Sequence, residues 1–301
     1  MISIIISSQS EEVLATVSEN IADTINVPFE IIAIENKKGL IGICEAYNTG
    51  AVKATYDIFC FMHEDISIHT YNWGNILINH FKNEAYGLIG IAGGDTKSLV
   101  PSSWASFTHP SEVSIVQHFK YQSKPPEKVL RTGYPDDSST LKPVACIDGV
   151  WICTRRSVYE QCKFDSITFP GFHGYDIDYS LQVARAGFKI GVVFDIDIHH
   201  YSEGSFKHVW MKNAMQVSEK WKQFLPFSVR DLPKKEFIHN HWTTIRNFLN
   251  KLIELDYSIY QLFFYLYKYS FNKYFHLFHF LHFNKEIIKK KIFRKGKLSS
   301  V

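Results

Sequence analysis

The chain has 301 residues, enough for one large domain or two modest ones around a substantial core. Hydrophobic residues make up 46% and charged residues 21%, which excludes a wholly disordered or collagen-like chain. A formal net charge of +3 is too small to indicate that the protein binds nucleic acid.

Apolar, strand-like runs alternate with helix-like segments in the first half of the chain. The predicted strands are residues 2–7, 29–34, 57–62 and 88–92. One predicted helix follows the first strand and ends at residue 22, and two others span residues 43–54 and 71–81. This alternation predicts an α/β fold with a mostly parallel sheet covered on both faces. Such sheets bind ligands beyond the carboxyl ends of their strands, so Ser8, Glu35 and the run from His63 to Asp65 are candidate site residues.

The cell compartment is inferred from the N-terminus and the cysteines. The first residues lack the basic region of a signal peptide and are interpreted as a strand. Five cysteines form no CxxC pair, and an odd number cannot all pair within the chain. We therefore expect a cytoplasmic protein.

The strand over residues 57–62 ends at His63, Glu64 and Asp65. Carboxylate oxygens suit Mg²⁺ or Mn²⁺, which keep coordination positions open for phosphate oxygens. The pattern favours a divalent-cation site at these acids. The alternative is that Glu64 and Asp65 cap the next helix or face water.

Residues 93–143 interrupt the alternation, because they are rich in Ser, Pro, Asp and Lys and have weak periodicity. We interpret them as one long loop that shapes the site and closes over it; the alternative is a disordered insertion. Strand and helix signals resume at 144–154 and from Arg156.

A Gly-rich loop precedes a helix predicted over residues 176–186, which begins with Asp176 and Asp178. Carboxylates in a first turn are favoured by the helix dipole, so capping explains one of them. A carboxylate held in a cleft can also act as a general base.

A strand predicted over 189–198 is followed by His199 and His200. Neighbouring side chains on an extended chain point in opposite directions, so at most one of the two histidines reaches a given site. The alternative for either is a structural hydrogen bond.

A domain boundary is predicted near residues 225–233, followed by helices over 235–252 and 257–283. The second is rich in aromatic residues but is interrupted by polar ones, and a membrane span needs about 20 predominantly apolar residues. Residues 285–297 carry seven basic residues and one acid. These features favour a helix in the membrane interface with a basic tail on anionic headgroups. The alternative is an appendage packed on the catalytic domain or on a second subunit of a homodimer.

No GxSxG, Walker A, HExxH or GxGxxG motif occurs. Taken in order, the segments over residues 1–206 resemble family 2-type glycosyltransferases of the GT-A fold. The greatest resemblance is to the bacterial subgroup whose metal motif reads His-(Asp/Glu)-Asp. The segments that carry it are SIIISS, FEIIAIEN, GICEAYNTGAVKA, His63-Glu64-Asp65, IDGVWICTRRSVYE, GYDIDYSLQVARAG and HHYSEGS. The motif begins with His in place of Asp, and Tyr47 and Tyr175 replace an Arg and a Glu common in the family.

The resemblance implies a GT-A domain over residues 1–228 and a helical extension over 229–301. It implies these site residues: Ser7, Ser8, Gln9, Glu35, Asn36, Asn48 and Glu64 for the donor; Asp65 and His200 for the metal; Asp148 and Gly149 for the acceptor; Asp176 as catalytic base, with Asp178 the second choice.

The implied reaction is metal-dependent, inverting transfer of a sugar from a nucleotide-diphosphate sugar, with UDP expected, to an acceptor hydroxyl. Mn²⁺ or Mg²⁺ is the implied cofactor, and a surface glycan or a lipid-linked precursor is the implied acceptor, which would make this an enzyme of polysaccharide biosynthesis. Two alternatives remain: a sugar nucleotidyltransferase, whose phosphate loop usually carries the Gly and Lys that residues 7–10 lack, and a non-catalytic carbohydrate-binding relic.

Overall fold

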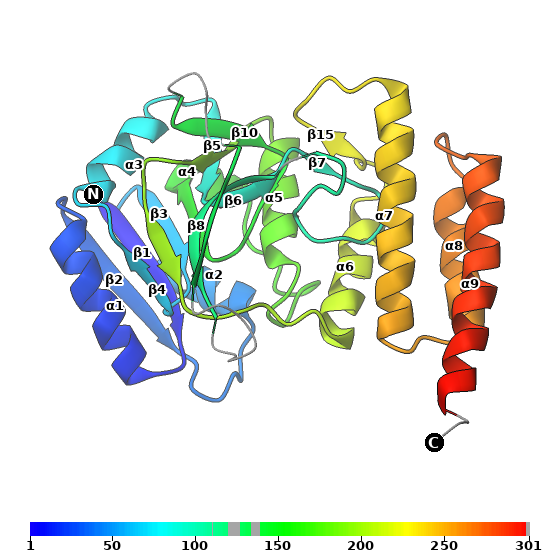
Figure 1. Ribbon diagram of the computed structural model, residues 1–301. Coiled ribbons are helices and arrows are strands. Elements are labelled where there is room, and N and C mark those ends of the chain that lie inside the picture. The colour runs from blue at the N-terminus through cyan, green and yellow to red at the C-terminus, as the bar shows by residue number, and fades with distance from the viewer. Residues whose placement is uncertain (110, 120–126, 134–138, 299–301) are drawn as a thin grey trace.

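The structure, a computed structural model, describes residues 1–109, 111–119, 127–133 and 139–298 (Figure 1). Its centre is a seven-stranded sheet in the order β10-β13-β5-β12-β3-β1-β2. The strands are β1 (Ile2–Ser8), β2 (Phe29–Glu35), β3 (Ile58–Met62), β5 (Tyr86–Gly90), β10 (Leu141–Val144), β12 (Trp151–Arg155) and β13 (Lys189–Val193).

The predicted α/β class is confirmed, and the sheet is mixed. Strands β2, β1 and β3 are parallel, as are β13 and β5. Strand β12 runs antiparallel to both β3 and β5, and β10 runs antiparallel to β13. The carboxyl ends of β1, β2 and β3 therefore meet at one edge.

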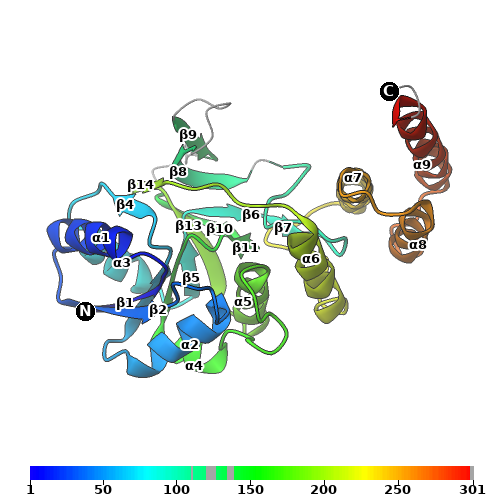
Figure 2. The same cartoon turned by 90° about the horizontal axis from the view of Figure 1, so that it is seen from below.

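Helices cover both faces of this sheet (Figure 2). They are α1 (Glu11–Thr24), α2 (Ile43–Lys53), α3 (Trp73–Phe81), α4 (Arg156–Gln161) and α5 (Tyr175–Arg185). One core cluster contains Phe59 and Phe61 and packs under α2, α4 and α5. The other contains Trp73 and Trp151 and packs under α1 and α3. Because both faces are buried, the strands read as continuous apolar runs.

The prediction of one long loop over residues 93–143 was wrong. The described part contains the strands β6 (Ala92–Gly94), β7 (Thr96–Lys97), β8 (Glu112–His118) and β9 (Glu127–Thr132), with residues 110, 120–126 and 134–138 outside the description. Strand β8 pairs with β6, β9 and β14. Val113 and Ile115 pack on the core from alternate positions of β8, as expected for a strand with one face on the core.

The predicted strand over 189–198 is divided. Strand β13 ends at Val193, and β14 (Ile198–His200) belongs to a second sheet in the order β11-β6-β8-β14-β4, with β4 (Ile66–Ile68) and β11 (Cys146–Ile147) at its edges. Between β13 and β14 the chain turns, and Asp195 there accepts a hydrogen bond of 2.9 Å from His80. Both His199 and His200 thus lie within a strand.

The C-terminal helices are α6 (His208–Lys220), which was not predicted, α7 (Lys234–Glu254), α8 (Ile259–Ser270) and α9 (Leu277–Leu298). The single helix predicted over 257–283 was wrong: Asn272 ends α8 by donating to Tyr269 O and accepting from Tyr274 N. Helix α7 stands between α6 and the α8–α9 pair (Figures 1 and 2). Within the described residues, no helix is both long and apolar enough to cross a bilayer. The side chains beyond Lys290, which include most of the basic tail, lie outside the description.

Candidate active site

Two neighbouring cavities lie at the edge where the parallel strands end. The first, of about 530 Å³, is lined by residues that include Ser7, Gln9 and Glu64. The second, of about 310 Å³, is lined by residues that include Asp148 and Asp176. His63 and Phe172 line both cavities, so the two adjoin.

The loop after β1 is held by Glu64. Its carboxylate accepts hydrogen bonds from Ser8 Oγ at 2.9 Å, from Gln9 N at 3.0 Å and from Ser10 N at 3.4 Å. Ser10 in turn caps α1 by accepting from Val13 N. Glu64 therefore shapes the wall of the first cavity from the strand end that faces the loop.

Asn36 braces the same loop from β2. Its amide donates to Ser7 Oγ at 3.3 Å and to Ile41 O at 2.9 Å, and its backbone N–H donates to Ser8 O at 2.7 Å. Glu35 lies at the rim with 77% of its side chain exposed, 3.7 Å from Lys37 Nζ. The predicted donor residues of β1, β2 and β3 thus converge, whereas Asn48 does not join them.

The amide of Asn48 is used elsewhere. It donates to Phe164 O at 2.7 Å and accepts from Tyr159 Oη at 2.8 Å. Asn48 lines neither cavity, and it ties α2 to the segment after α4. Its prediction as a donor-binding residue is corrected to a structural role, because both ends of the amide are already paired.

His63, Asp65 and His200 form a group that could hold a metal ion, with one ligand atom from each within 4.8 Å of the others. Asp65 Oδ1 lies 3.6 Å from His200 Nε2 and 3.9 Å from His63 Nδ1. The sequence pointed to Asp65 and His200 as metal ligands, whereas His63, the third member of this group, was not predicted as one. The signal for His63 was its place directly before two acids at a strand end.

Hydrogen bonds set the tautomer of each histidine. Tyr175 Oη donates to Gly149 O at 3.1 Å, so it accepts from His63 Nε2, also at 3.1 Å, and the lone pair is left on His63 Nδ1. The Gln117 amide nitrogen donates to three carbonyl groups, so Gln117 Oε1 accepts from His200 Nδ1 at 3.0 Å. The lone pair is on His200 Nε2, where it accepts a hydrogen bond of 3.2 Å from Ser202 Oγ. Both lone pairs are on the nitrogen nearer Asp65.

The donor set fits a divalent cation. Two neutral imidazole nitrogens and one carboxylate oxygen would leave coordination positions open for phosphate oxygens and water. Imidazole ligands favour Mn²⁺ over Mg²⁺, which prefers oxygen. His199 cannot contribute to this group, because it points to the other side of β14 and stacks on His69 with centroids 3.9 Å apart.

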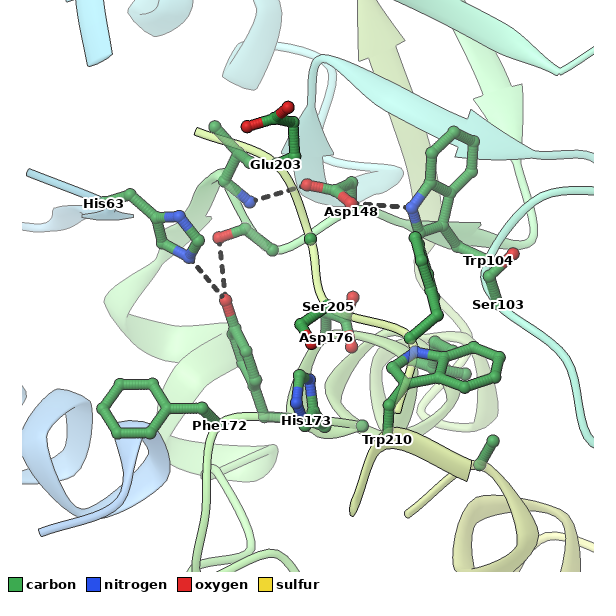
Figure 3. Close-up of a pocket in the computed structure, with 18 of the residues that line it drawn as sticks. His63, Ser103, Trp104, Asp148, Phe172, His173, Asp176, Glu203, Ser205 and Trp210 are labelled. Atoms are coloured by element: carbon green, nitrogen blue, oxygen red, sulfur yellow. Dashed lines mark hydrogen bonds between the residues drawn. The ribbon is translucent and has the colours of Figure 1, made fainter. Parts of the chain in front are cut away.

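Asp176 and Asp148 share the second cavity (Figure 3). Asp148 is fixed by Trp104 Nε1, which donates to it at 2.7 Å, and by Val150 N at 2.9 Å. Burial, and then the charge of Asp148, raise the pKa of Asp176 to about 7. A carboxyl with that pKa exchanges a proton readily near neutral pH.

Asp178, the second choice for the base, is buried away from both cavities. Its carboxylate accepts from Trp221 Nε1 and Lys220 Nζ, each at 2.7 Å, and from Gln182 at 2.9 Å. These bonds join α5 to α6. The prediction of Asp178 as a catalytic residue is therefore corrected to a structural role.

Gly149, predicted on the acceptor side, acts through its lack of a side chain. A Cβ atom there would collide with the hydroxyl of Tyr175, which must pass close by to reach His63. Gly149 thus permits the Tyr175–His63 contact.

Sequence reasoning also missed Trp104 and Lys97. Lys97 is 1% exposed and donates to Ser102 O at 2.9 Å, to Ser102 Oγ at 2.6 Å and to Ser103 O at 3.2 Å. Burial lowers its pKa to about 8. Lys97 therefore fixes the segment that carries Trp104. The composition of residues 93–143 held no signal for either role.

The family described as "Glycosyltransferase like family" matches residues 2–224. No curated protein matches the chain. Among solved structures, GalNAc-T7 with UDP, GalNAc and Mn²⁺ is similar with a TM-score of 0.50 and 11% identity, over 89% of this chain and 55% of that chain. S. aureus TarS 1–349 in complex with UDP-GlcNAc has a TM-score of 0.43 and 10% identity, over 89% and 70%. A197 from STIV has a TM-score of 0.38 and 11% identity, over 67% and 86%. The chain thus spans little more than half of GalNAc-T7.

Proposed function

The chain belongs to the glycosyltransferase-like family, and we propose that it transfers a sugar with inversion from a nucleotide-diphosphate sugar, expected to be a UDP-sugar, to an acceptor hydroxyl. Its fold is the predicted GT-A type. The observation that carries the proposal is the position of the His63–Asp65–His200 group, which adjoins the first cavity and faces the pocket of Asp176.

The first cavity suits the nucleotide. Ser7 and Gln9 in its lining, and the exposed Glu35 beside Lys37 of that lining, would offer hydrogen-bonding groups to a base and a ribose, while Ser8 would support the loop through Glu64. His63, Asp65 and His200 would hold the divalent cation, which supplies positive charge to the departing diphosphate. GalNAc-T7 was solved with UDP and Mn²⁺, and this donor set suits the same chemistry.

In the second cavity Asp176 would take the proton of the acceptor hydroxyl. As that oxygen forms its bond to the anomeric carbon, the bond from this carbon to the diphosphate breaks on the opposite face, which inverts the configuration. General-base assistance of this kind contributes about 10²–10⁴-fold. The raised pKa of Asp176 suits a base that works near neutral pH.

Thermal shift measurements with a panel of nucleotide sugars, with and without Mn²⁺, test this function. A UDP-sugar is expected to raise the melting temperature only with the metal, and slow hydrolysis should release UDP. A nucleotidyltransferase would instead release pyrophosphate from UTP and a sugar 1-phosphate. A non-catalytic relic would bind the donor without hydrolysing it.

For the extension over residues 229–301 we propose peripheral contact with an anionic membrane surface, such as the inner face of the cell membrane. Several aromatic side chains are exposed on α8 and just after it: Tyr260 (84%), Phe264 (59%), Tyr267 (48%) and Phe271 (60%). Lys285 and Lys289 are exposed on α9. Aromatic and basic residues together favour the lipid interface.

Sedimentation with phosphatidylglycerol vesicles tests this contact. Phe264→Ser combined with Phe271→Ser should reduce the fraction of protein bound to vesicles. The control Val52→Ser, which changes an exposed side chain of α2, should not reduce it. A homodimer through the same face would instead show a molecular mass that falls in the double variant, with no binding to vesicles by either protein.

A further inference from the structure

A third cavity, of about 270 Å³, adjoins the catalytic one on its outer side. It lies among the segment before β8, the start of α6 and the middle of α7. Ser102, Ser103, Phe206 and Trp210 line both cavities, so the outer one lies directly beside the pocket of Asp176. Figure 3 shows Trp104 and Trp210 on the side of that pocket away from His63.

The lining of the outer cavity is mainly apolar. Phe107 and Phe206 are 42% and 50% exposed at its mouth, and Met211 and Phe248 are buried beneath. Phe206 packs edge-on against Trp210, with centroids 5.1 Å apart. Exposed aromatic rings around a concavity are typical of a site whose ligand is itself apolar.

Helix α7 is a fixed wall of this cavity. Asn240 donates to Thr108 Oγ1 at 2.8 Å, and His109 Nε2 lies 3.1 Å from the Glu236 carboxylate. These contacts join α7 to the segment that carries Phe107. Asn247, Phe248 and Lys251 line the cavity from α7, beyond the residues that match the family. The outer cavity is therefore a feature that the helical extension completes.

We propose that the outer cavity binds the apolar portion of an amphiphilic acceptor, an alkyl or aryl group, while the hydroxyl-bearing end reaches Asp176. This orientation of the acceptor rests on the proposed function. If the nucleotide occupies the first cavity, the acceptor would approach Asp176 from the other side of the catalytic pocket, where the outer cavity lies. An apolar group on the acceptor would cover Phe107 and Phe206 and remove their surface from water.

A matched pair of glycosides tests this assignment. Methyl and n-octyl β-D-glucopyranoside carry the same sugar and differ in the apolar chain, and both are titrated calorimetrically into the full chain with UDP and Mn²⁺, below the micelle concentration. The octyl glycoside should bind at least about 10-fold more tightly. Phe206→Ala should remove most of this preference; the side chain is half exposed, so the change is expected to leave the fold intact.

Two further variants identify the location. Asn247→Trp, which fills the cavity from α7, should weaken octyl binding and leave methyl binding unchanged. Phe264→Ala removes an aromatic ring of similar exposure from α8 and should keep the preference. Equal affinity of the two glycosides, or a preference that survives both Phe206→Ala and Asn247→Trp, would overturn the proposal.

The same titrations separate this proposal from the proposed function. If UDP binds with Mn²⁺ but the octyl preference is absent, the apolar subsite is wrong and the transferase function stands. If the preference depends on Phe206 but UDP does not bind, the cavity binds apolar groups and the donor assignment is wrong.

Discussion

His200 Nε2 lies 3.6 Å from Asp65 Oδ1, and the register of two short strands brings them together. In the β14–β4 ladder His200 is opposite Ile66, the residue after Asp65. Tyr201 N also donates to Asp65 O at 2.9 Å. The ladder thus joins the end of β3 to a segment much later in the chain, and the proposed metal site of His63, Asp65 and His200 depends on it.

Asp65→Ala is expected to weaken Mn²⁺-dependent binding of UDP by at least about 100-fold, because it removes the anionic ligand between two imidazoles. Calorimetry with and without Mn²⁺ measures this, and Mg²⁺ should support weaker binding than Mn²⁺. Asp57→Ala, at an exposed carboxylate before β3, is the control. UDP affinity that is equal in Asp65→Ala and the parent would refute the metal assignment.

Gln117→Leu is expected to weaken Mn²⁺ affinity by about 10–100-fold, because it removes the acceptor that keeps the proton on His200 Nδ1. Gln117→Glu retains an acceptor for that proton and should restore part of the affinity. Melting temperatures without metal give the structural cost of each variant. If both variants lose affinity equally, Gln117 does not act through the tautomer of His200.

Glu64→Ala is expected to lower UDP affinity by about 10-fold while leaving the affinity for Mn²⁺ alone unchanged. Glu64 accepts hydrogen bonds from Ser8, Gln9 and Ser10, so its removal should leave the loop after β1 without a fixed conformation. Glu12→Ala, an exposed acid on α1, is the matched control. A loss of Mn²⁺ affinity in Glu64→Ala would mean that Glu64 ligates the metal.

The rate of transfer is expected to rise with pH and to reach half its maximum near pH 7, because Asp176 must be deprotonated to accept a proton. Asp148→Asn should move the midpoint to lower pH, since the charge of Asp148 is the second cause of the shift after burial. Glu160→Gln, exposed on α4, should not move it. A rate that is flat across neutral pH would exclude Asp176 as the base.

Asp176→Asn is expected to abolish transfer, keep UDP binding and stabilise the fold above pH 7. The folded-state pKa of Asp176 lies above its ordinary value, so the folded protein binds the proton more tightly and loses stability as pH rises to about 7. The amide removes this cost, by on the order of 1–2 kcal/mol once solvent screening is included. Thermal unfolding should show no gain at low pH; a gain that is equal at low and high pH would contradict this reason.

The sequence was informative where a pattern reports local geometry. Alternating apolar runs predicted the sheet, and polar residues at strand ends predicted that Ser8, Glu64 and Asp65 lie at one edge. The spacing of Asp176 and Asp178 also distinguishes the two acids, because residues two apart on a helix point to different sides. Asp176 accordingly lines the cavity, whereas Asp178 accepts a hydrogen bond from Trp221 on another side of the helix.

Other features depend on contacts between distant segments, which a single sequence does not report. Asn48 has the type and helical position of a ligand-binding amide, but Tyr159 and Phe164 occupy it. Gln117 lies in β8 and Trp104 lies between β7 and β8, both within the span that was predicted to be one loop. Their partners, His200 and Asp148, are known only from the tertiary structure.

The most direct test is anomalous diffraction from a crystal of the full chain grown with Mn²⁺ and UDP. The account predicts a manganese peak bonded to Asp65 and to ring nitrogens of His63 and His200, with the diphosphate on its open side and the Asp176 carboxylate facing the empty sugar position. A manganese peak on other residues, or a diphosphate bound outside the cavity of Ser7 and Gln9, would contradict it.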